Sequence, residues 1–407
     1  MKRAAVLSIV LAAAGAAQQP AANYDESKVP AYTLPDVLGK AHDAKSWAAR
    51  RAEILDLYTK DVFGSNPRTP ARVKFTASAE APALDGKAIR KIVTISFGNA
   101  GPKPQMLIYL PAGAKKPSRM FLGLNFGPIA MVANDPGVPL GEEWVRDPQS
   151  KAMVKKPMPE SARGRSASRW SIDKMLAAGY GLAVIDYNDF EPDFDGGRQY
   201  GVRALWYDES ATWGAIGAWA WGLSRAMDYL VTDPKVDAKH VAVFGHSRLG
   251  KTSLWAGAED TRFAMVIANE SGEGGAAISR RAYGERTKDL NTRFPHWFCA
   301  NYRKYNDKED EMPFDSHFLI ALSAPRPLYV ASAVEDQWSD PRGEFLGVVH
   351  ASRVYEMLGK KGIGTDKMPG LHEPIQQDVA YHIRAGKHDV TAYDWEQYIR
   401  FADQEWK

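Results

Sequence analysis

The stretch VAVFGHSRLGKTSLW, residues 241–255, decides how the fold of this chain is interpreted. An apolar run ends in a Gly-His-Ser turn and helical character follows, which predicts a strand, a tight turn and a helix. Two motifs overlap in the turn. From Gly245 to Thr252 the spacing satisfies the phosphate-loop pattern G-x-x-x-x-G-K-[ST]. Gly245 and Ser247 also begin a nucleophile elbow, G-x-S-x-G, whose second glycine comes one residue late.

Seven apolar runs of strand character occur along the chain, and the later ones alternate with helix-like stretches. The first two runs lie close together and predict an antiparallel start, whereas the later alternation predicts βαβ units. We therefore predict an α/β fold with a mostly parallel central sheet and helices on both faces. The runs are KIVTISFG (91–98), QMLIYLPA (105–112), MFLGLNFG (120–127), YGLAVIDY (180–187), HVAVFGHS (240–247), FAMVIANES (263–271) and RPLYVASAVED (326–336). The helix-like stretches are 46–64, 210–231 and 343–359.

This organisation decides between the two motifs. A phosphate loop normally follows an early strand of its domain, yet several predicted strands precede Gly245, and the next one ends in Asn269-Glu270 without the usual Asp. In an elbow, by contrast, Ser247 has its hydroxyl exposed at the carboxyl edge of the sheet with helix amides behind it. A serine that only caps the following helix is the simpler alternative. We interpret Ser247 as a nucleophile on a sheet of the α/β-hydrolase type.

The chain begins with MKRAAVLSIVLAAAGAA, residues 1–17. Lys2 and Arg3 precede an apolar run that ends in small residues, as in a secretory signal peptide. A buried helix is the alternative, but the positive start and the abrupt polar end disfavour it. We therefore predict an exported protein, periplasmic or secreted, and no membrane span, because no second apolar run is long enough.

The remaining chain is predicted to be one catalytic domain over residues 34–407, preceded by an extended arm at 18–33. Long stretches without a clear period lie near 128–170 and 275–325. Insertions of this length in an α/β protein are often placed over the site, so we expect both to form its walls.

Composition excludes several classes of partner. The 407 residues are 45% hydrophobic and 25% charged, which is enough apolar material for a large core. The formal charge is +3, and loss of Lys2 and Arg3 with the signal would leave +1, so nucleic-acid or membrane-surface binding has no support. Cys299 is the only cysteine, which excludes an intramolecular disulfide and a thiolate metal cluster and predicts a buried apolar side chain. We expect a monomer without metal or cofactor.

A nucleophilic serine needs a base and an acid, and in this architecture they follow it in the order acid, then histidine. Of the histidines after the last predicted strand, at 350, 372, 382 and 388, His388 occupies the usual position, in a loop before a C-terminal helix that begins near Tyr393. Two acids compete to orient it. Asp336 follows the last predicted strand, and Glu270 follows the preceding strand in the glycine-rich NESGEGG. Either can fix the imidazole tautomer, and the residues alone leave the choice open.

Four segments together resemble a known family. GHSRLGK, NESGEGG, EDQWSDP and RAGKHD are similar to the glucuronoyl esterases, carbohydrate esterase family 15, especially their bacterial members, and the similarity runs from about Leu34 to the C-terminus. The elbow G-x-S-R-x-G-K distinguishes this family from general serine hydrolases and accounts for the late glycine. The resemblance implies hydrolysis of the ester between a 4-O-methylglucuronic acid branch of glucuronoxylan and a lignin alcohol.

The resemblance also implies roles for the reacting groups. Ser247 would be the nucleophile that forms a glucuronoyl-serine intermediate, and His388 the base. Glu270 would be the family's usual acid, and Asp336 the second acid of some bacterial members. No metal or cofactor is implied.

Further residues match family positions around the substrate. Arg248 would supply guanidinium and backbone donors to the oxyanion, and a permanent cation beside the nucleophile suits that role. Lys251, Glu285 and Trp338 would hold the hydroxyls and ring face of the sugar; without the resemblance, Glu285 is one charge in a mixed-charge loop. Fungal members have a disulfide-bonded cysteine where this chain has His246, for which we expect a packing role.

Two other functions fit the same sequence. Another carbohydrate esterase of this fold, an acetylxylan or feruloyl esterase, would share the catalytic residues without needing the sugar contacts. A non-catalytic glycan-binding protein on the same scaffold would keep the sugar contacts and lose a catalytic residue, and the presence of all of them disfavours it.

Overall fold

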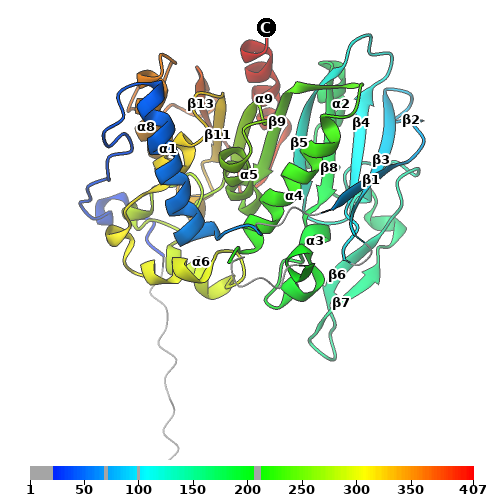
Figure 1. Cartoon of the computed structure of the whole chain (residues 1–407), viewed down its shortest axis with the longest axis horizontal. Helices are drawn as coiled ribbons and strands as arrows, with labels where there is room; N and C mark the ends of the chain where they lie inside the picture. The colour runs from blue at the N-terminus through cyan, green and yellow to red at the C-terminus, as the bar shows by residue number, and fades with distance from the viewer. Residues whose placement is uncertain (1–21, 68–71, 99–100, 206–211) are drawn as a thin grey trace, which may run out of the picture.

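An 11-stranded sheet runs through the protein, and helices cover both of its faces (Figure 1). The computed structural model describes residues 22–67, 72–98, 101–205 and 212–407. The strand order is β1-β3-β4-β8-β5-β9-β10-β11-β13-β12, with β2 paired to β3. The strands are β1 (Val73–Ala77), β2 (Ala81–Ala83), β3 (Ala88–Phe97), β4 (Gln105–Pro111), β5 (Ser118–Asn125), β8 (Tyr180–Asp186), β9 (Val236–His246), β10 (Met265–Asn269), β11 (Leu328–Ala333), β12 (Ile375–Gln376) and β13 (Val379–Arg384).

The sheet has a parallel part, from β8 through β5, β9, β10 and β11 to β13, and an antiparallel part. The strands from β8 to β13 are parallel to their neighbours, whereas β1 to β4 form an antiparallel start and β12 an antiparallel edge. A separate hairpin pairs β6 (Glu142–Arg146) with β7 (Met153–Pro157). The predicted mostly parallel sheet with an antiparallel N-terminal start is confirmed.

The alternation of side chains along β9 shows how the two faces are covered. Val241 and Val243 belong to one hydrophobic cluster, and Ala242 and Phe244 belong to the other. Strand neighbours point to opposite faces, so a strand with apolar residues at every position must be buried on both sides. The predicted three-layer α/β-hydrolase sandwich is therefore confirmed. Its helices are α1 (Ala44–Tyr58), α2 (Ile172–Ala177), α3 (Tyr187–Phe190), α4 (Ala215–Leu230), α5 (Arg248–Glu259), α6 (Thr287–Arg293), α7 (Ser316–Ala321), α8 (Pro341–Met357) and α9 (Ala392–Glu405).

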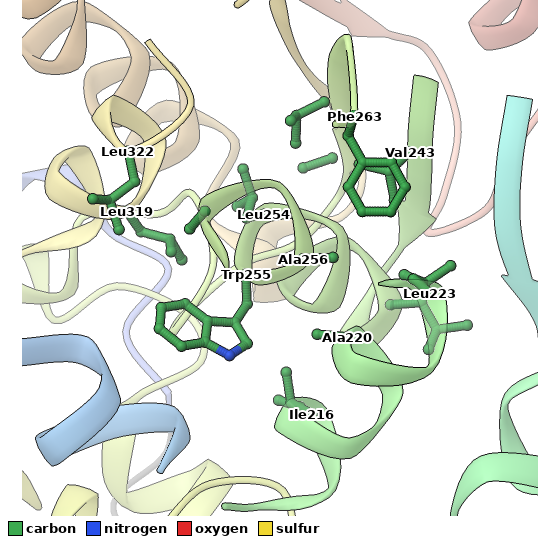
Figure 2. Close-up of a cluster of buried hydrophobic side chains, with 14 of the residues drawn as sticks. Ile216, Ala220, Leu223, Val243, Leu254, Trp255, Ala256, Phe263, Leu319 and Leu322 are labelled. Carbon is green, nitrogen blue, oxygen red and sulfur yellow. The ribbon is translucent and has the colours of Figure 1, made fainter. Parts of the chain in front are cut away.

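The core behind the elbow fixes the position of α5 (Figure 2). Trp255 and Leu254 of α5 are fully buried, as are Ile216 and Ala220 of α4. Burying one large aliphatic side chain is worth roughly 1.5–3 kcal/mol. Because α5 is packed this tightly, the turn at its N-terminus has a fixed place at the sheet edge.

Six strands of the described residues were not predicted, namely β1, β2, β6, β7, β12 and β13, and of these β13 bears on the site. The sequence interpretation ends the sheet at β11 and places His382 in or beside a loop, which is wrong, because His382 lies in β13 and is fully buried. The strand was not recognised because His382 and Arg384 interrupt the apolar pattern by which a buried strand is predicted. His382 and Arg384 are buried because the carboxylate of Asp394 pairs with both.

The N-terminal arm is described from residue 22 and packs on the loop before α6. The Gly284 amide donates to the Asn23 carbonyl over 2.8 Å, and Arg281 pairs with Glu26 at 2.5 Å. The predicted signal peptide, residues 1–17, lies outside the described residues. Within the described ranges, no helix has the length and apolar character needed to cross a membrane.

Candidate active site

The turn between β9 and α5 has the backbone of a strained elbow. Ser247 has φ 58° and ψ −129°, a conformation that side-chain-bearing residues rarely adopt and that costs roughly 1–3 kcal/mol. A Cβ at Gly245 would lie 1.7 Å from the Leu249 carbonyl oxygen, so only glycine fits there. At Gly250 a Cβ would lie 3.0 Å from the Cβ of Ser271, so the late glycine lets α5 approach the loop after β10.

The four predicted reacting residues follow neighbouring parallel strands. Ser247 follows β9, Glu270 follows β10, Asp336 lies just beyond β11, and His388 lies just beyond β13. The carboxyl ends of parallel strands meet at one sheet edge, where loops from several strands can place side chains around one ligand. Folding therefore brings Ser247 and His388, which are 141 positions apart in the sequence, to the same edge of the sheet.

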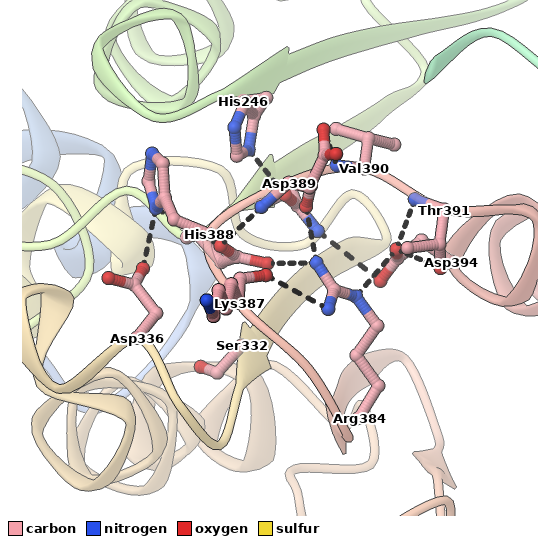
Figure 3. A network of polar contacts seen from close by, with 12 residues as sticks. His246, Ser332, Asp336, Arg384, Lys387, His388, Asp389, Val390, Thr391 and Asp394 are labelled. Atoms are coloured by element: carbon pink, nitrogen blue, oxygen red, sulfur yellow. Dashed lines mark hydrogen bonds and ion pairs between the residues drawn. The ribbon is translucent and has the colours of Figure 1, made fainter. Parts of the chain in front are cut away.

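Nδ1 of His388 faces both candidate acids, and Figure 3 shows its contact with Asp336. This nitrogen is 2.6 Å from Oδ2 of Asp336 and 3.1 Å from Oε2 of Glu270. An Nδ1–H bonded to a carboxylate leaves Nε2 as the nitrogen that accepts a proton, as a triad base requires. In this structure Asp336 is therefore the closer partner, and Glu270 is the second one.

The two acids differ in their protonation. Burial raises the pKa of Glu270 to about 8, although His388 and Arg384 partly offset the effect of burial. Burial also acts to raise the pKa of Asp336, but the hydrogen bond and charge of His388 outweigh it, and the pKa of Asp336 is lowered. Burial alone would lower the pKa of His388, yet the two carboxyl groups outweigh it and raise this pKa to about 9. Asp336 thus carries the negative charge beside His388 throughout the neutral range.

Arg384 organises the loop that carries His388, and the sequence interpretation missed it (Figure 3). The guanidinium is buried and bonds to Oε1 of Glu270 at 2.6 Å and to Oδ2 of Asp394 at 2.8 Å. It also donates to the carbonyl groups of Ala385, Lys387 and Asp389. One cation therefore fixes an acid of the site and the backbone on both sides of His388. The only signal was its place at the start of RAGKHD, four residues before the histidine.

His246 packs against the imidazole of His388. Its ring centroid is 4.5 Å from that of His388, and its Nδ1 donates to Oδ1 of Asn269 at 2.6 Å. The Nδ2 group of Asn269 donates to the hydroxyl of Tyr398, and this bond orients the amide so that its Oδ1 faces His246 as an acceptor. Burial, with the charge of His388, holds the pKa of His246 well below its usual value, so His246 is neutral. These contacts fit the expected packing role.

His246, Glu270 and His388 also offer ligand atoms within 4.8 Å of one another, the set within the described residues that could hold a metal ion. These groups are already engaged. His246 bonds to Asn269, Glu270 to Arg384, and His388 to Asp336. The three side chains therefore already have hydrogen-bond or ion-pair partners within the protein.

Arg248 stands beside the nucleophile on the first turn of α5. One terminal nitrogen donates to Asp193, and the guanidinium carbon lies 4.7 Å from the centre of the Trp297 ring. Its Nε–H is buried and has no hydrogen-bond partner among the residues that the structure describes. A buried, unpaired N–H on a permanent cation is a donor available for a developing oxyanion.

The three predicted sugar contacts form one bonded group. Lys251 donates to Oε2 of Glu285 over 3.1 Å, and the indole N–H of Trp338 donates to Oε1 of Glu285 over 3.0 Å. Lys251 also donates to the carbonyl of Ser271, the residue after Glu270. Lys251 lies one helical turn after Ser247, and Trp338 lies two residues after Asp336, so this group adjoins the reacting residues.

Known proteins were compared with this chain. A glucuronoyl esterase from Solibacter usitatus is 59% identical, the alignment covers 94% of this chain and 100% of that one, and the TM-score is 0.89. A carbohydrate esterase named MZ0003, from an unknown prokaryotic organism, is 49% identical over 95% of this chain and 93% of its own length. This chain belongs to the glucuronoyl esterase family. The family predicted from the four sequence segments is thereby confirmed.

Two further comparisons concern the breadth of this family. The family model described as "Glucuronyl esterase, fungi" matches residues 167–359, which include Ser247, Glu270 and Asp336 but end before His388. A solved structure described as a promiscuous esterase of carbohydrate esterase family 15, from a marine bacterial metagenome, is 48% identical with a TM-score of 0.88, and the alignment covers 94% of this chain and 100% of that one. The 4-O-methyl-glucuronoyl methylesterase of Podospora anserina is 34% identical, over 79% of this chain and 58% of that enzyme.

A further buried acid of this glucuronoyl esterase family member was not predicted. Glu344 of α8 accepts from the amides of Ser271 and Gly272 at 2.7 and 3.0 Å and from the hydroxyl of Ser332 at 2.7 Å. It thus ties the loop after Glu270 to β11. In the sequence Glu344 is an ordinary helix acid, so no local signal marks it.

Proposed function

We propose that this protein is a serine esterase that hydrolyses the ester between a 4-O-methylglucuronic acid branch of glucuronoxylan and a lignin alcohol. One observation carries the proposal: a histidine held by two acids packs on His246, the residue before the elbow serine, at the sheet edge where the bonded group Lys251–Glu285–Trp338 also lies. The first part suits acyl transfer, and the second offers a cation, a carboxylate and an aromatic face to a sugar acid.

Ser247 performs the first step. His388 removes the proton of the Ser247 hydroxyl through Nε2, and the serine oxygen attacks the carboxyl carbon of the uronate ester. The tetrahedral oxyanion takes hydrogen bonds from Arg248, a preorganised donor whose removal typically costs about 3–4 kcal/mol. The alcohol then leaves with the proton from His388, and a glucuronoyl-serine ester remains.

Water completes the reaction. His388, again neutral, takes a proton from water, the hydroxide attacks the acyl carbon, and the glucuronate leaves as Ser247 recovers its proton. Asp336 and Glu270 hold the imidazole in one tautomer and stabilise its charged form during both steps. No proton passes to either acid in this scheme.

The sugar contacts select the acyl side of the ester. Lys251 and Glu285 are almost completely buried, so a hydroxyl group that bonds to them meets charged groups already removed from water. Hydrogen bonds to charged groups are worth about 1.5–3 kcal/mol each. Trp338 is half-buried and presents a face on which a pyranose ring can lie.

A broader esterase activity is the second candidate, because a relative 48% identical to this chain is described as promiscuous. An acetylxylan or feruloyl esterase would use the same serine, histidine and acids. The two functions differ in whether Lys251, Glu285 and Trp338 contribute to turnover. Export of the protein by the segment at residues 1–17 would place either activity where plant polymers are found, and that export is part of the proposal.

A panel of esters separates these candidates. We expect kcat/KM for benzyl glucuronate to exceed that for benzyl acetate, which has the same alcohol, and that for a feruloyl ester. Equal or greater turnover of the acetyl or feruloyl ester would keep the serine esterase and contradict the uronate assignment. The lignin side is tested by comparing benzyl with methyl glucuronate.

A further inference from the structure

A second network of polar contacts surrounds Arg248 and is centred on Asp193. The carboxylate is only 4% exposed. Its Oδ1 accepts from Nε2 of His296 at 2.8 Å and from the indole N–H of Trp297 at 2.7 Å. Its Oδ2 accepts from the hydroxyl of Tyr187 at 2.9 Å and from Arg248. A buried carboxylate that accepts hydrogen bonds from four donors has its hydrogen-bonding capacity filled, and its position is fixed.

Three separate segments of the chain meet at this carboxylate. Asp193 follows β8 and α3, Arg248 begins α5, and His296 and Trp297 belong to the predicted insertion after β10. The Asp193 amide is held in turn by Oδ1 of Asn188 at 3.1 Å. The position of the carboxylate is thus set by the sheet edge, independently of Arg248.

Charge and packing both restrict Arg248. Burial acts to raise the pKa of Asp193, but its donors, with His296 first, outweigh burial and lower this pKa, so the carboxylate is ionised at neutral pH. The guanidinium carbon lies 5.5 Å from the ring centre of Phe294 and 5.7 Å from that of Phe126, in addition to its contact with Trp297. Cation–π contacts of this kind fix the plane of a guanidinium.

We infer that Asp193 is a positioning residue of the esterase: it fixes the guanidinium of Arg248 through one terminal nitrogen, so that the buried Nε–H remains free for the oxyanion. This inference rests on the proposed acyl transfer at Ser247. Without the anchor, the flexible arginine side chain can turn into solvent, and the donor must be ordered again in every turnover. The effect falls on the transition state, because the oxyanion exists only there.

Asp193→Asn tests the anchor with little change in shape. The amide oxygen can still accept from His296 and Trp297, whereas the amide nitrogen faces Arg248 as a second donor. We expect kcat to fall about 10- to 100-fold, less than the 10²–10³-fold typical of a deleted oxyanion donor, while KM changes less than about threefold. An unchanged kcat would overturn the inference.

A double-mutant cycle with Arg248→Gln separates positioning from folding. If Asp193 acts through Arg248, Asp193→Asn lowers kcat in the wild type and has no further effect in the Arg248→Gln protein. The same loss in both backgrounds would overturn the inference, because Asp193 would then support the fold alone. Tyr187→Phe is the matched control: it removes a neutral donor from the same oxygen, and we expect kcat to stay within about threefold of the wild type.

The cycle is measured with whichever ester in the panel the wild type hydrolyses fastest, so failure of the uronate assignment does not affect it. If Asp193→Asn does not fold, Asp193→Glu replaces it. The longer side chain keeps the charge and displaces the carboxylate from Arg248. We expect a lowered kcat with retained KM, and an unchanged kcat would overturn the inference.

Discussion

The two acids beside His388 can be separated by changing each to its amide. Asp336→Asn and Glu270→Gln, alone and together, preserve size and a hydrogen-bond acceptor but remove a carboxyl group. Each single change leaves one carboxylate near Nδ1, at 3.1 Å for Glu270 or 2.6 Å for Asp336. Because the remaining acid can hold the imidazole in its productive tautomer, we expect the two to be partly redundant.

The magnitudes follow from the geometry. In a triad with one acid, the Asp-to-Asn change lowers kcat by about 10⁴, because the histidine adopts the wrong tautomer. Here each single variant should lose only about 3- to 30-fold relative to the wild type, so additive effects would give at most about 10³-fold, whereas the double variant should approach the full 10⁴. Asp336→Asn should be the more damaging single change, since Asp336 is closer to His388 and has the lower pKa.

The assay is single-turnover hydrolysis of benzyl glucuronate by all four proteins, with thermal unfolding as a control for folding. Free energies of activation that add across the two sites would contradict the redundancy. So would a 10⁴-fold loss in one single variant, because one acid would then do all the work. Either result would mean that the two carboxyl groups do not substitute for each other at Nδ1.

Three further predictions concern other contacts of the site. His388 must be neutral to act as a base, so its raised pKa of about 9 moves activity to higher pH. Asp336→Asn removes a group that raises this pKa and should therefore move the midpoint of the kcat/KM profile down by about one pH unit. An unchanged midpoint would refute the charge coupling. Arg384→Met leaves two buried carboxylates without their cation and should lower the free energy of unfolding by about 3–5 kcal/mol in a denaturant titration, whereas a loss below 1 kcal/mol would mean that the pairing is not stabilising. Trp338→Ala should raise KM for benzyl glucuronate about tenfold, roughly 1.4 kcal/mol, and leave benzyl acetate unchanged; an equal effect on both esters would rule out a sugar platform.

Much of the sheet was predictable because burial on both faces leaves a simple pattern. In β9 every residue from Val241 to Phe244 is apolar, and the alternation with α4 and α8 indicates parallel strands. β13 was not predicted because two of its buried positions carry the polar residues His382 and Arg384. These residues are tolerated in a strand only through Asp394, which lies on α9 and is invisible to a local pattern.

The candidate site was predictable where a residue follows a strand. Ser247, Glu270 and Asp336 each do so, and their strands are neighbours in the sheet. The distance of each acid from His388 was not predictable, because it depends on how Arg384 folds the loop before that histidine.

Asp193 shows the limit of sequence reasoning more clearly. Its partners Arg248 and His296 are 55 and 103 residues away in the chain. The surrounding EPDFDGG is an acidic, glycine-containing turn, which is typical of a solvated loop. Only the folded structure shows that this carboxylate is buried and that it binds the arginine beside the nucleophile.

The central claim is that Ser247 attacks a uronate ester. The most direct test is the rate of benzyl glucuronate hydrolysis by Ser247→Ala, compared with wild type, together with binding of glucuronate to both proteins. We expect turnover to fall by about 10⁶-fold, the loss seen when a triad serine is removed, with glucuronate binding retained because Lys251, Glu285 and Trp338 are untouched. Turnover within tenfold of wild type would contradict the claim.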